Sequence, residues 1–316
     1  MAINRYIKTA LKTISNIDID VKKDYELIRR LERVVKRPPV RFINQMADYE
    51  IKTDDHNIPI RIYSPALNIV ESLENVKKYP VIVFFHGGGW TTGDLDSYER
   101  LCLRLARQTG HIVVSVGYRL APENPFPAAL RDCHRAIRSV ARWHRVSGSD
   151  NKITIMGDSA GGNLAAAVSL YMRDRGEVCA DRQILIYPAL YNDHTSASPF
   201  ASVAENGAEY VLTAKNICDY MDLYCPVEED RQSPYCAPLL ADDLSGQPDT
   251  LIITAQYDPL RDEGEEYGRR LRAAGNNAGV YRIDDTLHGF FSLPASFGAV
   301  KKSFEIINQF LKEDPQ

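Results

Sequence analysis

One serine of this chain stands in a sequence that favours an exposed, reactive hydroxyl. The pentapeptide Gly157-Asp158-Ser159-Ala160-Gly161 follows the β-branched run 153–155 and precedes 163–170, whose residues favour a helix. This order of strand, sharp turn and helix pushes the side chain of Ser159 out of the sheet edge, and the small neighbours tolerate the strain. A solvated serine in a glycine-rich turn would have the same pentapeptide, so the base, the acid and the oxyanion donors must be found elsewhere.

Two later loops supply an acid and a base. His288 follows the last predicted strand, and Asp258 follows the strand before it. Both side chains should therefore reach the carboxyl end of the sheet. Pro259 favours an extended backbone at Asp258, whereas Asp262, the alternative acid, stands where the next helix needs an N-cap. We predict that Ser159, Asp258 and His288 form a catalytic triad, in the chain order of α/β-hydrolases.

A second glycine cluster would stabilise the negative charge that attack by a serine creates. His86-Gly87-Gly88-Gly89-Trp90 follows a buried apolar run, and consecutive glycines weaken a strand, so their use is close backbone approach to a substrate. We predict an oxyanion hole made of the N–H groups of Gly88, Gly89 and Ala160. His86 lies on this side of the site, so we expect it to hydrogen-bond the glycine loop and not to act as the base.

Three further side chains are predicted to line the substrate pocket. Trp90 follows the glycine loop and Phe290 follows His288, and both would narrow the pocket and favour short acyl chains. The alternative is that these aromatic residues belong to the core. Asp158, the variable residue of the pentapeptide, either faces the pocket or braces the turn.

The elements that position these residues alternate in the manner of a parallel, doubly wound sheet. An antiparallel hairpin over 49–53 and 58–63 precedes them, and 66–79 is interpreted as a loop. Asp96 and Glu99 have the spacing of a capping box at the start of a helix. The other strands are expected at 81–85, 112–116, 153–155, 183–187, 250–255 and 280–283, and the helices at 97–108, 127–145, 263–274 and 297–311.

Two segments do not follow this alternation of strands and helices. Residues 1–45 contain two amphipathic helical patterns, and 189–241 is too apolar for a solvated loop. We expect both to form a helical cap over a core made of 46–188 and 242–316. The first pattern, built on Ile3, Ile7, Leu11 and Ile14, is basic and could instead lie on a membrane surface.

The composition is that of an ordinary soluble globular protein. The chain has 316 residues, of which 44% are hydrophobic and 25% charged, and its net charge of -4 gives no reason to expect nucleic acid as a partner. Its six cysteines form no CxxC pair and are expected to be free thiols, Cys225 and Cys236 being the least implausible disulfide. No signal peptide or membrane-spanning run is apparent, so we expect a cytoplasmic protein without membrane contact.

Five motifs together resemble the hormone-sensitive-lipase family of esterases. They are His86-Gly87-Gly88-Gly89-Trp90, Tyr118-Arg119-Leu120-Ala121-Pro122-Glu123, Gly157-Asp158-Ser159-Ala160-Gly161, Asp258-Pro259-Leu260-Arg261-Asp262 and His288-Gly289-Phe290. The resemblance runs from about residue 80 to the C-terminus. It implies an eight-stranded, mostly parallel α/β-hydrolase sheet with a helical cap, and a structural role for 118–123.

The resemblance also implies hydrolysis of short- to medium-chain carboxylic esters without metal or cofactor. The expected partner is a small-molecule ester, and the sequence leaves a homo-oligomer open. One alternative is that the same triad acts on amides, thioesters or in an elimination reaction. Another is a non-catalytic small-molecule receptor on the same fold, although the receptors that resemble this family have lost the histidine that His288 provides.

Overall fold

One sheet of eight strands organises the computed structural model, which describes residues 20–36, 43–148, 152–177 and 180–313. The strand order is β1-β2-β4-β3-β5-β6-β7-β8. The first two strands pair antiparallel, as do β2 and β4, and all other pairs are parallel. The strands are β1 (Met46–Lys52), β2 (Asn57–Tyr63), β3 (Val81–Phe85), β4 (Ile112–Val116), β5 (Ile153–Asp158), β6 (Arg182–Ile186), β7 (Asp249–Tyr257) and β8 (Ala278–Leu287). This is the predicted α/β-hydrolase sheet.

Helices cover both faces of the sheet, which explains why the central strands are apolar throughout. In β3, Val83 packs into the core shared with α5 (Ala128–Val146), α6 (Ala160–Arg173) and α9 (Arg261–Ala273). Its neighbour Phe84 points to the other face, into the core shared with α4 (Glu99–Thr109) and α10 (Gly298–Lys312). Successive residues of a strand thus enter opposite cores.

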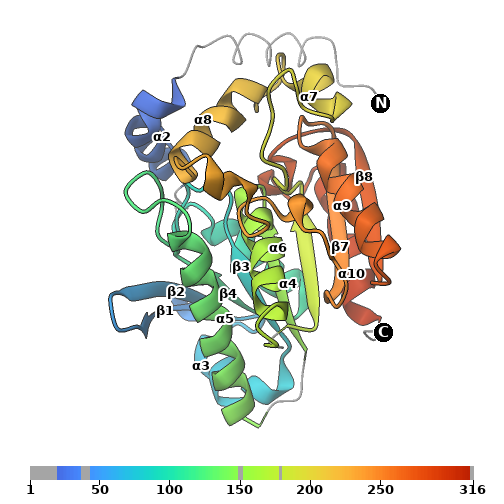
Figure 1. The fold of residues 1–316 in the computed structure, drawn as a ribbon. Coiled ribbons are helices and arrows are strands. Elements are labelled where there is room, and N and C mark those ends of the chain that lie inside the picture. Colours follow the sequence, from blue (N-terminus) through green and yellow to red (C-terminus); the bar gives the residue numbers. More distant parts are fainter. Residues whose placement is uncertain (1–19, 37–42, 149–151, 178–179, 314–316) are drawn as a thin grey trace.

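A helical cap lies over the carboxyl end of the sheet (Figure 1). It combines α7 (Ala201–Asn206) and α8 (Ala214–Tyr224) from the predicted insertion with α2 (Val21–Lys36) from the N-terminal region. The α2 and α8 helices pack against each other, and Lys22 pairs with Asp222 between them. Ile217 and Met221 of α8 are buried in the core that contains residues of α6, so the cap packs directly on the core that surrounds α6.

Two local predictions for the part of the core before β4 were wrong. Residues 66–79 include a helix, α3 (Ile69–Glu74), which Asn68 caps by accepting a hydrogen bond from the Val70 N–H at 2.9 Å. The capping box at α4 does not form, because Asp96 and Glu99 both bind the guanidinium of Arg61, at 2.9 and 3.2 Å. In both cases the local structure depends on a hydrogen bond or ion pair that the spacing of apolar residues does not predict.

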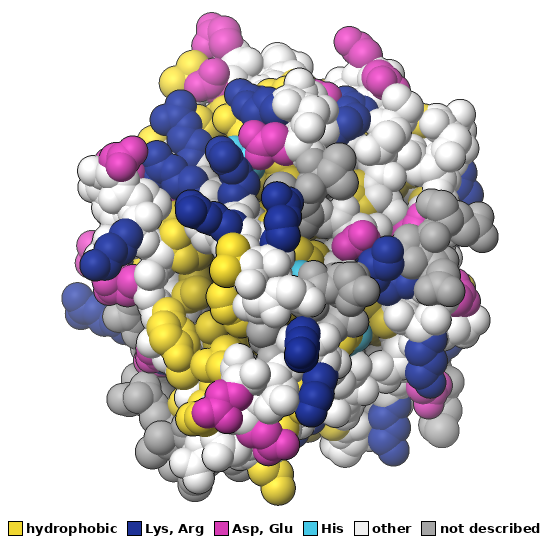
Figure 2. Space-filling view, turned by 90° about the horizontal axis from the view of Figure 1, so that it is seen from below, with side chains coloured by type: hydrophobic (Ala, Val, Ile, Leu, Met, Phe, Trp, Pro, Cys, Tyr) yellow, Lys and Arg dark blue, Asp and Glu magenta, His cyan; other side chains and the backbone are white. Residues whose placement is uncertain are grey.

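Other expectations concern surfaces and thiols. The helix predicted around Ile3 to Ile14 lies outside the described residues. No helix in the described ranges combines the length and the apolar character needed to cross a membrane. On the face opposite the cap, Figure 2 shows Lys and Arg side chains interspersed with Asp and Glu, beside a cluster of hydrophobic side chains. The cysteines at 102, 133, 218, 225 and 236 are free thiols, and Cys179 lies outside the described residues.

Candidate active site

Ser159 lies in a strained turn at the centre of the sheet. β5 ends at Asp158, α6 begins at Ala160, and Ser159 between them has φ 55° and ψ −121°. A non-glycine residue at such a φ needs support from its surroundings. Here the Ser159 N–H donates to the carbonyl oxygen of Ile186 at 2.9 Å. The turn therefore fixes the backbone from which the hydroxyl projects.

The three predicted triad residues meet in one hydrogen-bonded chain. His288 Nε2 lies 2.9 Å from Ser159 Oγ, and His288 Nδ1 lies 2.7 Å from Asp258 Oδ2. The carboxylate of Asp258 is fully buried, and its other oxygen accepts the Leu260 N–H at 2.9 Å. A carboxylate so placed favours the tautomer with the proton on Nδ1 and leaves the Nε2 lone pair facing the serine.

Asp262, the alternative acid, is engaged elsewhere. Its carboxylate accepts the backbone N–H of Ser202 on α7 at 2.8 Å and the Arg261 Nε–H at 2.8 Å. The prediction that Asp262 caps α9 was wrong, since the N-cap position belongs to Leu260. Asp262 therefore joins the cap to the core and takes no part in the hydrogen-bonded chain.

The glycine loop adopts the conformation that only glycine tolerates readily. Gly88 and Gly89 have φ of 115° and 56°. The carbonyl oxygen of Gly88 accepts the N–H groups of Thr91 and Thr92, at 3.0 and 2.8 Å. Because C=O and N–H point in opposite directions across a trans peptide, the Gly89 N–H lies on the other side of that peptide, free of this turn. Ala160, at the first position of α6, has an N–H without a partner inside the helix.

Asp158 holds the glycine loop by hydrogen bonds. Its Oδ1 accepts the Gly87 N–H at 2.9 Å and its Oδ2 accepts the Tyr98 hydroxyl at 3.0 Å. Burial and the nearby charge of Asp158 raise the pKa of Tyr98 well above its ordinary value, so the phenol stays protonated and donates. Of the two roles left open for Asp158, the structure shows the bracing one, and the residue is 3% exposed.

The aromatic residues predicted for the pocket are core residues. Trp90 is 1% exposed, stacks on Tyr224 with ring centroids 4.4 Å apart, and donates from Nε1 to Asn163 Oδ1 at 3.3 Å. Phe290 is 3% exposed and packs edge-on against Tyr187. The alternative interpretation of these two side chains, as core, therefore describes them better than the pocket prediction does.

His86 and Tyr118 hold the glycine loop from a further side. His86 Nδ1 donates to the carbonyl oxygen of Gly87 at 2.8 Å, as expected for a structural histidine. The Tyr118 hydroxyl donates to the carbonyl oxygen of His86 at 2.7 Å, and the two rings stack with centroids 4.3 Å apart. Burial raises the pKa of Tyr118 well above its ordinary value, so this donor is also retained.

Sequence reasoning missed several residues that contact the site. Tyr187, directly after β6, has φ 35° and places its ring 4.7 Å from the ring of His288. Tyr98 reaches Asp158 from the segment before α4, and Arg29 of α2 donates to the carbonyl oxygen of Thr91 at 2.6 Å. A place directly after a buried strand could have indicated Tyr187. Nothing in the local sequence marks Tyr98 or Arg29.

The fold and the hydrogen-bonded chain together define an α/β-hydrolase. The chain belongs to this family, whose model, described as alpha/beta hydrolase fold, matches residues 82–292. The chain is 34% identical to an arylesterase of Saccharolobus solfataricus over 89% of each chain, and 36% identical to Esterase LipI of Mycobacterium tuberculosis over 93% of this chain and 88% of that protein.

Solved structures agree with the family assignment. A hyperthermophilic esterase from the archaeon Pyrobaculum calidifontis superposes with a TM-score of 0.84 at 34% identity, covering 99% of this chain and 98% of that one. The esterase rPPE, in complex with (S)-Ac-CPA, superposes with a TM-score of 0.86 at 27% identity, covering 98% and 97%. The match spans the cap as well as the core.

Proposed function

We propose that the protein is a serine carboxylesterase that hydrolyses short- to medium-chain esters through an acyl-enzyme. The observation that carries this proposal is the hydrogen-bonded chain from Ser159 through His288 to the buried carboxylate of Asp258. The esterase names of the relatives support ester hydrolysis as the reaction.

In the first step, Ser159 Oγ adds to the ester carbonyl and His288 Nε2 takes its proton. Asp258 orients the imidazole and stabilises its charged form. The N–H groups of Gly88, Gly89 and Ala160 stabilise the oxyanion, and each such donor contributes about 3 to 4 kcal/mol to the transition state. The imidazolium then protonates the leaving alcohol, and water repeats the sequence on the acyl-enzyme.

The surroundings of the site support a preference for small acyl groups. The ring of Tyr220 on α8 lies so close to Gly89 that a Cβ there would come within 2.3 Å of it. The ring of Tyr187 lies 4.7 Å from the ring of His288. Bulky side chains thus lie beside the glycine loop, from the cap, and beside His288, from the end of β6, which leaves less room for a long acyl chain.

A chain-length series of nitrophenyl esters, acetate through dodecanoate, tests both parts of the proposal. We expect kcat/KM to peak at a short or medium chain and Ser159→Ala to lower kcat by roughly four to six orders of magnitude. Ser245→Ala, at an exposed serine, is the matched control and should not change kcat. More than trace activity in Ser159→Ala would reject the mechanism, and a maximum at decanoate or beyond would reject the chain-length preference.

A further inference from the structure

Arg29 of α2 contacts two loops of the site, although it precedes all five motifs in the chain. Its Nε donates to the carbonyl oxygen of Thr91 at 2.6 Å, and its Nη2 donates to the carbonyl oxygen of Ala121 at 2.8 Å. Nη1 and Nη2 also bind the two carboxylate oxygens of Glu123, at 2.8 and 2.9 Å. All three guanidinium nitrogens are engaged, in a forked geometry that lysine cannot reproduce.

Thr91 connects this guanidinium to the predicted oxyanion donors. Its N–H donates to the carbonyl oxygen of Gly88, while its own carbonyl oxygen accepts the Nε–H of Arg29. The carbonyl of Gly88 and the N–H of Gly89 belong to one rigid peptide plane. A displacement of Thr91 would therefore rotate the plane that carries the Gly89 donor.

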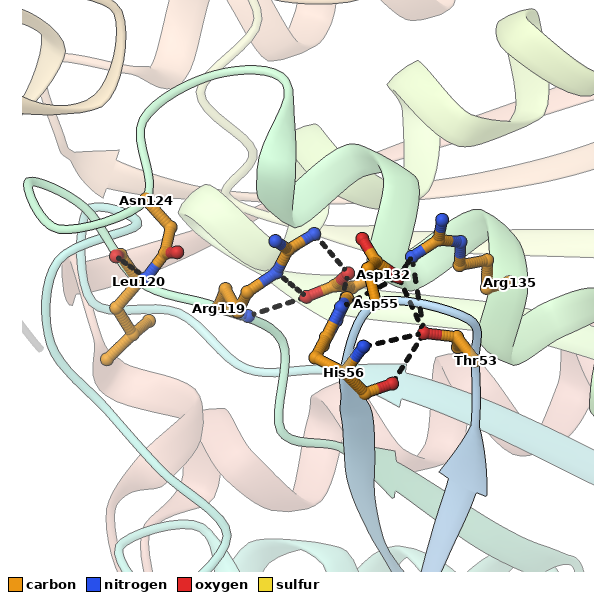
Figure 3. Close-up of polar contacts among 8 residues, drawn as sticks. All are labelled: Thr53, Asp55, His56, Arg119, Leu120, Asn124, Asp132 and Arg135. Atoms are coloured by element: carbon orange, nitrogen blue, oxygen red, sulfur yellow. Dashed lines mark hydrogen bonds and ion pairs between the residues drawn. The ribbon is translucent and has the colours of Figure 1, made fainter.

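The loop that contains Ala121 and Glu123 is itself anchored to other elements (Figure 3). Asp132, buried on α5, accepts the backbone N–H of Arg119 at 3.0 Å and two guanidinium N–H groups of the same residue, at 2.9 and 2.8 Å. His56, at the end of the β1–β2 hairpin, lies 2.9 Å from the same carboxylate. Further along the loop, the Ala121 N–H donates to the carbonyl oxygen of Trp90 at 2.9 Å. The loop is thus held from the core, independently of α2.

We infer that Arg29 is a positioning residue for the oxyanion donors, holding Thr91 against the loop of Ala121 and Glu123. The inference rests on the proposed ester hydrolysis and gives α2 a part in it. Because oxyanion donors act only when they are placed accurately at the developing charge, a loosened Thr91 should affect the chemical step more than the binding of substrate.

Arg29→Lys and Arg29→Ala test this inference against a matched control, Arg30→Ala. Arg30 is the next residue on the same helix and is exposed. We expect kcat for nitrophenyl acetate to fall about tenfold in Arg29→Lys and up to about a hundredfold in Arg29→Ala, with KM changed less than about twofold. Arg30→Ala should retain the kcat of the unmodified protein.

Two readouts separate positioning from a structural role. A trifluoromethyl ketone forms a reversible adduct with Ser159 whose oxyanion needs the same donors, so its Ki should rise by the factor by which kcat/KM falls. Added guanidinium ion should restore part of kcat in Arg29→Ala and should leave Arg30→Ala unchanged. Loss of folded protein alone would produce neither result.

A kcat within twofold of the unmodified protein in Arg29→Ala, or an effect on KM alone, would overturn the inference. An equal fall in Arg30→Ala would also overturn it. If Arg29→Ala does not fold, Arg29→Lys decides, because it keeps the charge and most of the packing. An unmodified protein inactive on every ester would instead reject the proposed function, so the two failures are distinguishable.

Discussion

At the scale of single residues, Asp158 of the pentapeptide braces the glycine loop through hydrogen bonds and does not face the pocket. Asp158 and Tyr98 form a buried pair, and both contact the N–H of Gly87, at 2.9 and 3.0 Å. The first residue of the glycine run is thereby tied to the strand that carries Ser159. The two halves of the predicted oxyanion hole, on different loops, share one polar support.

Removal of this support should cost stability as well as activity. Asp158→Ala leaves the buried Tyr98 hydroxyl without that acceptor, and we expect the free energy of unfolding to fall by about 1 to 3 kcal/mol. Tyr98→Phe should cost less, and the double variant less than the sum of the two, because the residues are directly bonded. Chemical denaturation measures all three.

Asp242→Ala, at an exposed carboxylate, is the control for the loss of an aspartate and should change stability by no more than about 0.5 kcal/mol. A cost for Asp158→Ala as small as that of Asp242→Ala would contradict the bracing role. Strict additivity of Asp158→Ala and Tyr98→Phe would show that the pair does not act as a unit.

At the scale of elements, the nucleophile turn depends on how closely α6 approaches the sheet. Gly161, in the first turn of α6, has no room for a side chain, since a Cβ there would lie 2.0 Å from the carbonyl oxygen of Phe85. Gly298, in the first turn of α10, is exposed and has no atom within 4 Å of the same position. The two helices thus have a glycine in the first turn in different physical surroundings: the one in α6 is required by a close contact, and the one in α10 is not.

A pair of glycine substitutions should separate these reasons. Gly298→Ala should stabilise the protein by about 0.4 to 1 kcal/mol, because alanine loses less backbone entropy in a helix. Gly161→Ala should destabilise it by about 3 kcal/mol or more and lower kcat, because α6 must move away from β3 and Ser159 moves with it. Thermal unfolding and ester turnover are the measurements. A Gly161→Ala protein as stable and active as Gly298→Ala would contradict the close approach.

Most of the strands and helices could be predicted from the sequence, but several contacts between them could not. Continuous apolar runs and the turns that follow them located the central strands and the elements that carry Ser159, Asp258 and His288. Local signals failed where a distant residue competed for the same groups. Asp96 and Glu99 have the spacing of a capping box, yet Arg61 of β2 binds both. The contact of Arg29 with Thr91 was also invisible, because it joins segments that only the folded chain brings together.

At the scale of the whole molecule, the cap and the α/β core share one hydrophobic interior. Tyr224 of α8 is fully buried and stacks on Trp90, which belongs to the glycine loop. The same interior contains Met221 of α8 and Leu164 of α6. Separate domains would bury separate cores. The cap should therefore unfold together with the core.

The two tryptophans of the chain allow a direct measurement of this cooperativity. Trp90 lies at the contact between cap and core, and Trp143 lies in the last turn of α5. In a Trp143→Phe protein, the fluorescence of Trp90 during denaturant unfolding should have the same midpoint as the far-UV circular dichroism, because two-state unfolding gives coincident transitions. A Trp90 transition at clearly lower denaturant would mean that the cap separates first, and the site would then lose Tyr220 and Arg29 before the sheet unfolds.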